Sequence, residues 1–149
     1  IGHSLGGALA TLAAYDSGVY LASQKITGIK LGLVTFGAPR VGNADFAKYI
    51  NESLGLSINI RITYRDDPII SVPWEDAYVH CGSEYKFTSE KLYGNGPSNE
   101  DKSPRVKGAW DLVYEYIKNG KDHSFYSQLD DKAIVDIISK TKKSFKKLK

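Results

Sequence analysis

The sequence predicts an α/β fold in which a mostly parallel sheet carries helices on both faces. Segments with helical periodicity alternate with short β-rich apolar segments, and this alternation is typical of βαβ units with right-handed crossovers. Strand-like segments at residues 29–36 and 57–64 follow helical ones, and residues 2–6 resemble a strand-to-helix turn. Because so few strands would make a small core, we expect residues 1–149 to be one partial domain whose N-terminal half is absent.

Four segments have the composition of helices. Residues 5–23 are small and aliphatic, and residues 44–54 place apolar side chains at helical spacing after a plausible N-cap, Asn43. Residues 106–118 and about 130–145 are the two predicted C-terminal helices. Each would cover a face of the sheet.

The predicted strands differ in their patterns. Residues 29–36 are apolar on both faces, as a central parallel strand should be, whereas residues 57–64 alternate apolar and polar side chains. Residues 78–87 are expected to form a further strand or a hairpin arm. Residues 89–103 are rich in Gly, Pro, Asn and Ser and are therefore expected to be a loop.

Composition is that of an ordinary soluble globular domain, with 42% hydrophobic and 25% charged residues. The apolar stretches are far shorter than the ~20 residues of a membrane span, so no transmembrane segment is expected. Six of the ten residues at 140–149 are lysine, and they account for the net charge of +3. This basic tail suits a solvated helix end or contact with an anionic lipid surface. Without basic residues interleaved with aromatic ones, nucleic-acid binding is not expected.

Two further features bear on the cellular compartment of the protein and on its covalent modification. Cys81 is the one cysteine, so the chain can form no internal disulfide, and we interpret it as a small buried hydrophobic residue. Asn51, Glu52 and Ser53 form a glycosylation sequon, which matters only if the protein is secreted.

Residues 2–6 match the G-x-S-x-G pattern of a nucleophile elbow, which holds a serine exposed at the top of a sheet. We expect Gly2 and Gly6 to be glycines because a tight turn leaves no room for a Cβ on either side of Ser4. The backbone N–H of Leu5, at the helix N-terminus, is expected to be one donor of an oxyanion hole. The second donor would come from an earlier part of the sheet, outside these residues.

A serine nucleophile needs a base, and the chain offers three histidines. His3 precedes Ser4 within the elbow, which should turn its side chain into the protein as a packed structural histidine. His80 is expected to lie in a strand, where a structural role is the better interpretation. His123 falls late in the chain, on a predicted loop between helices, and is our candidate for the base.

The base needs a carboxylate to orient it, expected on a loop after a sheet strand. Asp66 and Asp67 occupy such a place, and two adjacent carboxylates cannot both face one imidazole. We favour Asp67 because Pro68 restrains the backbone beside it. Asp122 is next to His123, and sequence neighbours rarely point at the same place.

Together these residues resemble the class 3 lipases, the fungal-lipase-like branch of the α/β-hydrolases. The resemblance rests on blocks at residues 2–10, 35–43, 61–67 with Val72 and Pro73 behind them, 80–85 and 122–126. It implies that Ser4 is the nucleophile, Asp67 the acid and His123 the base. It also places His80 where the family keeps a non-catalytic histidine. Ile70 stands where the family often has a proline.

The resemblance implies the C-terminal half of an α/β-hydrolase fold and a serine carboxylic-ester hydrolase. The expected activity is that of a triacylglycerol lipase, which acts on acylglycerols through an acyl-enzyme and needs no cofactor or metal. The alternatives are a feruloyl-type esterase or phospholipase of the same fold, or a non-catalytic fragment derived from a lipase. The lid and the second oxyanion donor would belong to the absent half, and the resemblance slightly favours secretion.

Overall fold

The computed structural model describes residues 1–87, 92–93 and 118–128. Its elements run in the order β1 (Gly2–His3), α1 (Leu5–Ser23), β2 (Gly32–Phe36), α2 (Ala44–Lys48), a π-helical turn η1 (Tyr49–Ser53), β3 (Ile58–Tyr64), a 3-10 turn η2 (Pro68–Ser71), β4 (Ser83–Phe87), β5 (Leu92–Tyr93) and a 3-10 turn η3 (Phe125–Gln128). Residues 106–117 of the helix predicted at 106–118, the helix predicted at 130–145, the basic tail at 140–149 and most of the loop predicted at 89–103 lie outside the described residues.

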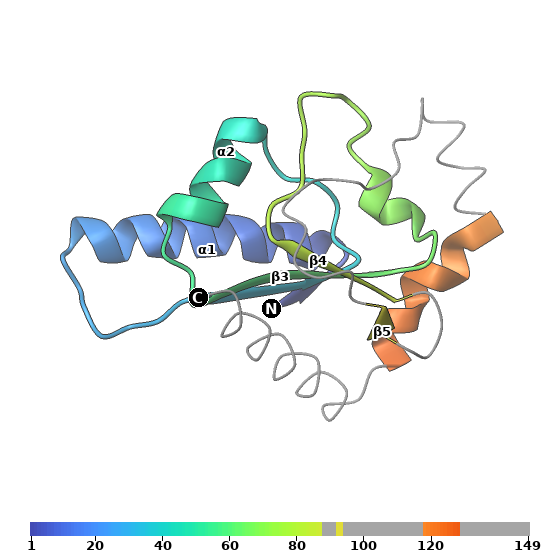
Figure 1. Cartoon of the computed structure of the whole chain (residues 1–149), viewed down its shortest axis with the longest axis horizontal. Coiled ribbons are helices and arrows are strands. Elements are labelled where there is room, and N and C mark those ends of the chain that lie inside the picture. The colour runs from blue at the N-terminus through green and yellow to red at the C-terminus, as the bar shows by residue number, and fades with distance from the viewer. Residues whose placement is uncertain (88–91, 94–117, 129–149) are drawn as a thin grey trace.

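The five strands form one sheet in the order β1-β2-β3-β4-β5 (Figure 1). The first four are parallel, and β5 pairs with β4 antiparallel. The predicted, mostly parallel sheet is confirmed. Parallel strands bring their carboxyl ends to a common edge, so the segments that follow β1, β2 and β3 meet there.

The helix predictions are close to the structure. The first predicted helix is α1, with the same bounds. The second is divided into α2 and η1, and Asn43 caps it because its side chain accepts a hydrogen bond from the Phe46 N–H at 2.9 Å. α1 and α2 lie on the same side of the sheet (Figure 1).

The strand predictions need three corrections. β2 begins at Gly32, where pairing with Ile58 of β3 begins, and not at Ile29, whose side chain is exposed. In the segment 78–87 only β4 is a strand, because Gly82 turns the chain with φ +87° just before it. Leu92–Tyr93 form β5 within the segment expected to be a loop.

The two faces of the sheet are buried in different ways. One face carries the apolar core, to which Tyr126 of η3 belongs: Val34, Phe36, Ile60, Ile62, Tyr64, Tyr85 and Phe87. On the other face, Thr35 of β2 lies against α1. Thr35 is in register with Arg61 of β3, and Arg61 is in register with Glu84 of β4. Arg61 is buried there and forms an ion pair with Glu84 at 3.2 Å. The polar positions of β3 therefore face the helices and not solvent.

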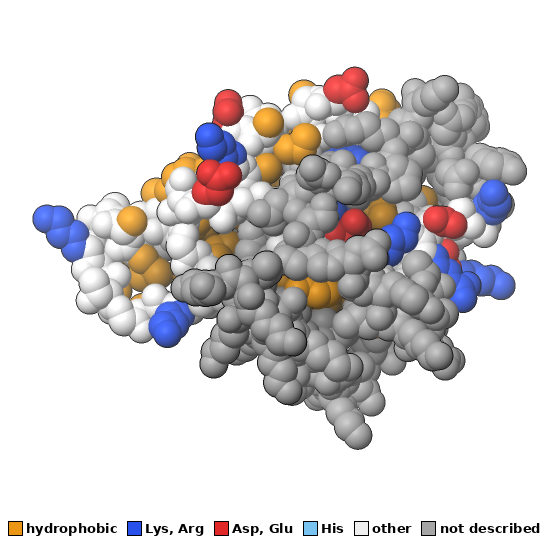
Figure 2. Space-filling model, viewed as in Figure 1, with side chains coloured by type: hydrophobic (Ala, Val, Ile, Leu, Met, Phe, Trp, Pro, Cys, Tyr) orange, Lys and Arg blue, Asp and Glu red, His pale blue; other side chains and the backbone are white. Residues whose placement is uncertain are grey.

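Hydrophobic side chains also reach the surface in the part of the molecule built from α1 and the loop after it (Figure 2). On α1 these exposed side chains are Leu5, Leu9, Leu12, Val19 and Tyr20. Among the described residues, no helix is long and apolar enough to cross a membrane.

Candidate active site

Ser4 lies in a tight turn between β1 and α1, with φ 56° and ψ −132°. A positive φ is strained for a residue that carries a Cβ. Backbone hydrogen bonds hold the turn on both sides: the Ser4 N–H donates to the Phe36 carbonyl at 2.9 Å, and the Gly7 N–H donates to the Ser4 carbonyl at 2.9 Å. The backbone therefore has the form of a nucleophile elbow.

The glycines around the elbow only partly follow the sequence prediction. A Cβ on Gly2 would collide with the backbone of Gly6, as expected. A Cβ on Gly6, however, would meet nothing within 4 Å among the described residues. The crowded position on the helix side is Gly7, where a Cβ would stand 2.6 Å from the Ala38 Cβ. Gly7 faces the sheet and brings α1 close to the residues that follow β2.

His123 is brought to the elbow from the far end of the chain. Its Nε2 lies 2.8 Å from the Ser4 Oγ, and its Nδ1 lies 3.0 Å from the Asp67 Oδ1. A carboxylate only accepts hydrogen bonds, so Nδ1 carries the proton and Nε2 is left to accept from the serine hydroxyl. Residues 118–124 are helical, so the prediction that His123 lies on a loop is wrong.

Asp67 is the carboxylate in contact with His123, and its side chain is almost completely buried (1% exposed). As the N-cap of η2 it also accepts a hydrogen bond from the Ile69 N–H at 2.9 Å. Pro68 occupies the start of this turn and restrains its backbone. Asp66 is exposed, and its backbone N–H donates to the Asp122 carboxylate at 3.3 Å. Asp66 and Asp122, the two other carboxylates that the sequence analysis considered, thus contact each other.

Tyr126, which the sequence analysis did not identify as a site residue, is a third partner of the Asp67 carboxylate. Its hydroxyl donates to Oδ2 at 2.9 Å and accepts from the Tyr64 N–H at 2.8 Å. Burial, together with the neighbouring Asp67 charge, raises the pKa of this phenol well above its usual value, so it stays a donor. No local sequence pattern pointed to it, because both of its partners lie about 60 residues earlier in the chain.

Gly37 makes room for this arrangement. It has φ +51°, and a Cβ there would stand 2.6 Å from the Asp67 Oδ2 and 2.5 Å from the Tyr126 ring. A side chain at this position would therefore displace both groups.

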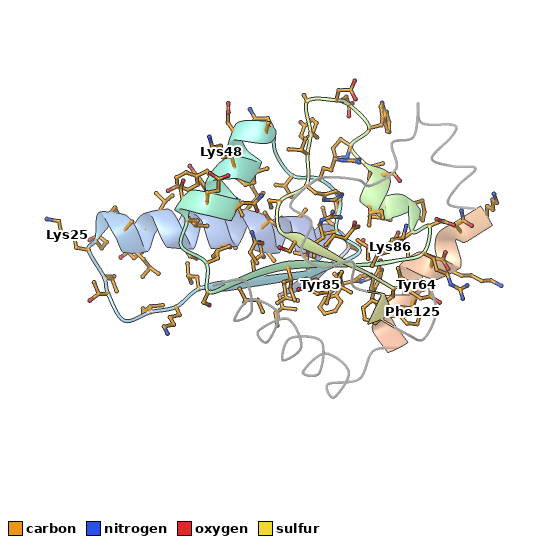
Figure 3. The ribbon with its side chains drawn as sticks, in the orientation of Figure 1. Lys25, Lys48, Tyr64, Tyr85, Lys86 and Phe125 are labelled. Atoms are coloured by element: carbon orange, nitrogen blue, oxygen red, sulfur yellow. The ribbon has the colours of Figure 1, made fainter. Side chains whose placement is uncertain are left out.

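An aromatic contact docks the segment 118–128 onto the end of β3. The ring of Phe125 stacks on that of Tyr64 with centroids 3.7 Å apart and planes 8° from parallel (Figure 3). The Arg65 guanidinium lies 5.1 Å from the centre of the same Tyr64 ring. Such stacking favours one placement of the segment relative to the sheet.

The other two histidines have different environments. His80 is buried with its Nε2 2.9 Å from the Ile70 carbonyl oxygen, and it lies outside the strand in which it was predicted. His3 is exposed and not turned into the protein, and its ring stacks on that of His123. Burial raises the pKa of the Cys81 thiol to about 11, so this thiol stays neutral.

Leu5 is the first residue of α1. The first N–H groups of a helix have no acceptor within the helix, and they carry its partial positive charge. The Leu5 N–H directly follows Ser4. It is therefore placed to donate to the oxyanion that would form when the serine oxygen attacks a carbonyl group.

Comparison with known proteins places this arrangement in a family. Residues 1–77 match the family model described as Lipase (class 3), which is just over half of the chain. The chain is 42% identical over 90 residues to the secreted mono- and diacylglycerol lipase A of Penicillium cyclopium, covering 60% of this chain and 27% of that protein. It is 38% identical over 87 residues to a lipase of Rhizomucor miehei, covering 58% of this chain and 23% of that protein.

Solved structures agree with the sequence comparison. The Rhizomucor miehei lipase propeptide complex matches with a TM-score of 0.57 and 29% identity over 82% of this chain and 37% of that one. The lipase of Rhizopus microsporus var. chinensis matches with a TM-score of 0.51 and 36% identity over 61% of this chain and 31% of that one. The chain spans about a quarter of the length of the curated relatives it matches. It belongs to the class 3 lipase family and has part of the α/β-hydrolase fold.

Proposed function

We propose that the protein carrying this chain is a serine carboxylic-ester hydrolase, a lipase that acts on acylglycerols. In this proposal Ser4 is the nucleophile, His123 the general base and Asp67 the acid that orients it. The observation that carries the proposal is the continuous line of hydrogen bonds from Asp67 through His123 to the Ser4 hydroxyl. It lies where the carboxyl ends of β1, β2 and β3 meet, the usual place for a site in a parallel sheet.

In the acylation step, the Ser4 Oγ attacks the ester carbonyl carbon while its proton passes to the His123 Nε2. The Nδ1–H remains bonded to Asp67, whose charge stabilises the imidazolium. The carbonyl oxygen becomes an oxyanion, which the Leu5 N–H would stabilise. When the intermediate collapses, the bond to the alcohol breaks and Nε2–H returns the proton to the leaving oxygen. The acyl group then remains on Ser4.

In the deacylation step, a water molecule replaces the alcohol. His123 takes a proton from the water, which attacks the acyl carbon, and then returns a proton to the Ser4 oxygen as the carboxylic acid leaves. The enzyme is restored, and no redox partner or cofactor takes part in the step.

The names of the relatives support an acylglycerol substrate, since those from Penicillium cyclopium and Fusarium solani are named mono- and diacylglycerol lipases. We propose a triacylglycerol as the substrate of the whole protein, and residues 1–149 as one part of its lipase-like domain. The similarity of this chain to about a third of a solved lipase supports that division.

The proposal is tested by measuring ester hydrolysis by the full-length protein and its Ser4→Ala variant. The substrates are a short-chain p-nitrophenyl ester, tri- and monoacylglycerols, a phospholipid and methyl ferulate. Ser17→Ala is the matched control, because Ser17 is an exposed serine on the same helix, α1. We expect acylglycerol hydrolysis that is lost in Ser4→Ala and kept in Ser17→Ala.

Three results would contradict the proposal. If the protein hydrolysed the phospholipid or methyl ferulate in preference to acylglycerols, the proposed lipase activity would be wrong and the activity would be that of a phospholipase or a feruloyl-type esterase. Turnover that persists in Ser4→Ala would refute the nucleophile. A folded wild-type protein with no turnover, and no labelling of Ser4 by an organophosphate ester, would indicate a non-catalytic relative.

A further inference from the structure

The segment that carries His123 is attached mainly to the end of β3. The Tyr126 hydroxyl contacts the Tyr64 N–H and the Asp67 carboxylate, and the Phe125 ring stacks on Tyr64. The Asp122 carboxylate accepts the N–H of Asp66. These contacts, like the bond from His123 to Asp67, all end on residues 64–67 and fix the segment relative to the acid.

The nucleophile is on a different part of the fold. Ser4 lies between β1 and α1, and 119 residues separate it from His123. The contacts on residues 64–67 therefore orient the imidazole toward Asp67 without directly fixing its distance from the Ser4 hydroxyl.

His3 connects the elbow directly to this segment. Its Nε2 lies 3.2 Å from the backbone carbonyl oxygen of His123, and because a carbonyl only accepts, the His3 Nε2–H is the donor. The two imidazole rings stack with centroids 4.8 Å apart and planes 27° from parallel. The His3 ring also lies 5.4 Å from that of Tyr126. The His3 side chain thus contacts both the backbone carbonyl and the ring of His123.

We propose that His3 is a positioning residue, which fixes the distance between the His123 Nε2 and the Ser4 Oγ by holding the His123 backbone against the elbow. The proposal rests on the proposed function of Ser4 and His123. Because His3 directly precedes Ser4, its side chain is placed by the same strained turn that places the nucleophile. A displacement of about 1 Å between reacting groups can cost about 10²-fold in rate.

The test uses three variants of the full-length protein with a p-nitrophenyl ester as substrate. His3→Ala removes both contacts, His3→Gln keeps an N–H donor of similar reach, and His3→Phe keeps a ring without a donor. We expect kcat of His3→Ala to fall about 10- to 100-fold with little change in KM. His3→Gln should recover most of kcat, and His3→Phe should not. Thermal unfolding of the three variants is measured beside kcat, so that activities are compared only among variants that fold like the wild type.

A spectroscopic measurement separates positioning from general support of the site. The proton shared by His123 Nδ1 and Asp67 should give a low-field ¹H NMR resonance that His3→Ala leaves unchanged, because the contacts to residues 64–67 remain. An unchanged kcat in His3→Ala would overturn the proposal, as would loss of this resonance or recovery by His3→Phe but not by His3→Gln. If turnover persisted in Ser4→Ala, the proposed function would fail and the positioning role with it. Ser4-dependent turnover unaffected by His3→Ala would overturn the positioning role alone.

Discussion

Replacing Tyr126 by Phe removes one oxygen atom from the centre of the hydrogen-bond network and leaves the ring in place. The hydroxyl joins the Asp67 carboxylate to the Tyr64 N–H, and the side chain is 6% exposed. Phe has nearly the same shape, so the variant creates no large cavity. The expected effects therefore come from the two lost hydrogen bonds and not from packing.

The free-energy cost of losing the two hydrogen bonds depends on the partner in each. A hydrogen bond to a charged group contributes about 1.5–3 kcal/mol, and a buried N–H left without an acceptor costs about 1–3 kcal/mol. The two losses are coupled, so we expect the free energy of unfolding to fall by about 3 kcal/mol. Asp67 keeps its bonds from Ile69 and His123, so we expect kcat to fall only about tenfold, equivalent to ~1.4 kcal/mol.

Urea denaturation and steady-state hydrolysis of a p-nitrophenyl ester measure these two effects. Tyr20→Phe is the matched control, because the Tyr20 side chain is 60% exposed on α1. The raised pKa of Tyr126 keeps its hydroxyl protonated at alkaline pH, so the ratio of wild-type to variant kcat should be the same at pH 7 and pH 9. If Tyr126→Phe matched Tyr20→Phe in both stability and kcat, the hydroxyl would have no part in holding Asp67.

Three further predictions concern neighbouring groups. Asp67→Asn should lower kcat about 10⁴-fold while Asp66→Asn stays close to wild type, and equal effects in the ester assay would contradict the choice of Asp67. Gly37→Ala should cost more unfolding free energy in urea than Gly28→Ala, since both have positive φ but only Gly37 faces a crowded site; equal losses would show that the site does not need this space. The pKa of about 11 at Cys81 should slow its alkylation by iodoacetamide at pH 8 roughly a hundredfold relative to the urea-unfolded chain, and similar rates would refute the raised pKa.

Local sequence signals predicted those parts of the fold and site that depend on adjacent residues. The elbow follows from the spacing of Gly2 and Ser4, because few other sequences can form so tight a turn. The preference for Asp67 over Asp66 followed from the restraint that Pro68 puts on the backbone, and the structure has Asp67 as the N-cap of the turn that Pro68 begins.

Tertiary contacts decided the features that the sequence analysis missed. The tight approach of α1 to the residues after β2 falls at Gly7 and not Gly6, since only Gly7 faces the sheet. Tyr126 joins the site through bonds to residues some 60 positions earlier, which no local pattern indicates. The alternating pattern of residues 57–64 did not indicate that Arg61 is buried; it lies beneath the helices, where it forms an ion pair with Glu84 of β4.

The central claim is that His123, and no other histidine of this chain, activates Ser4. Its most direct test is the ratio of kcat/KM for wild-type and His123→Gln full-length protein on a p-nitrophenyl ester, with His80→Gln measured beside it. We predict a fall of about 10⁴-fold or more for His123→Gln and a change of less than about tenfold for any His80→Gln protein that folds. Activity of folded His123→Gln within about tenfold of the wild type would contradict the account.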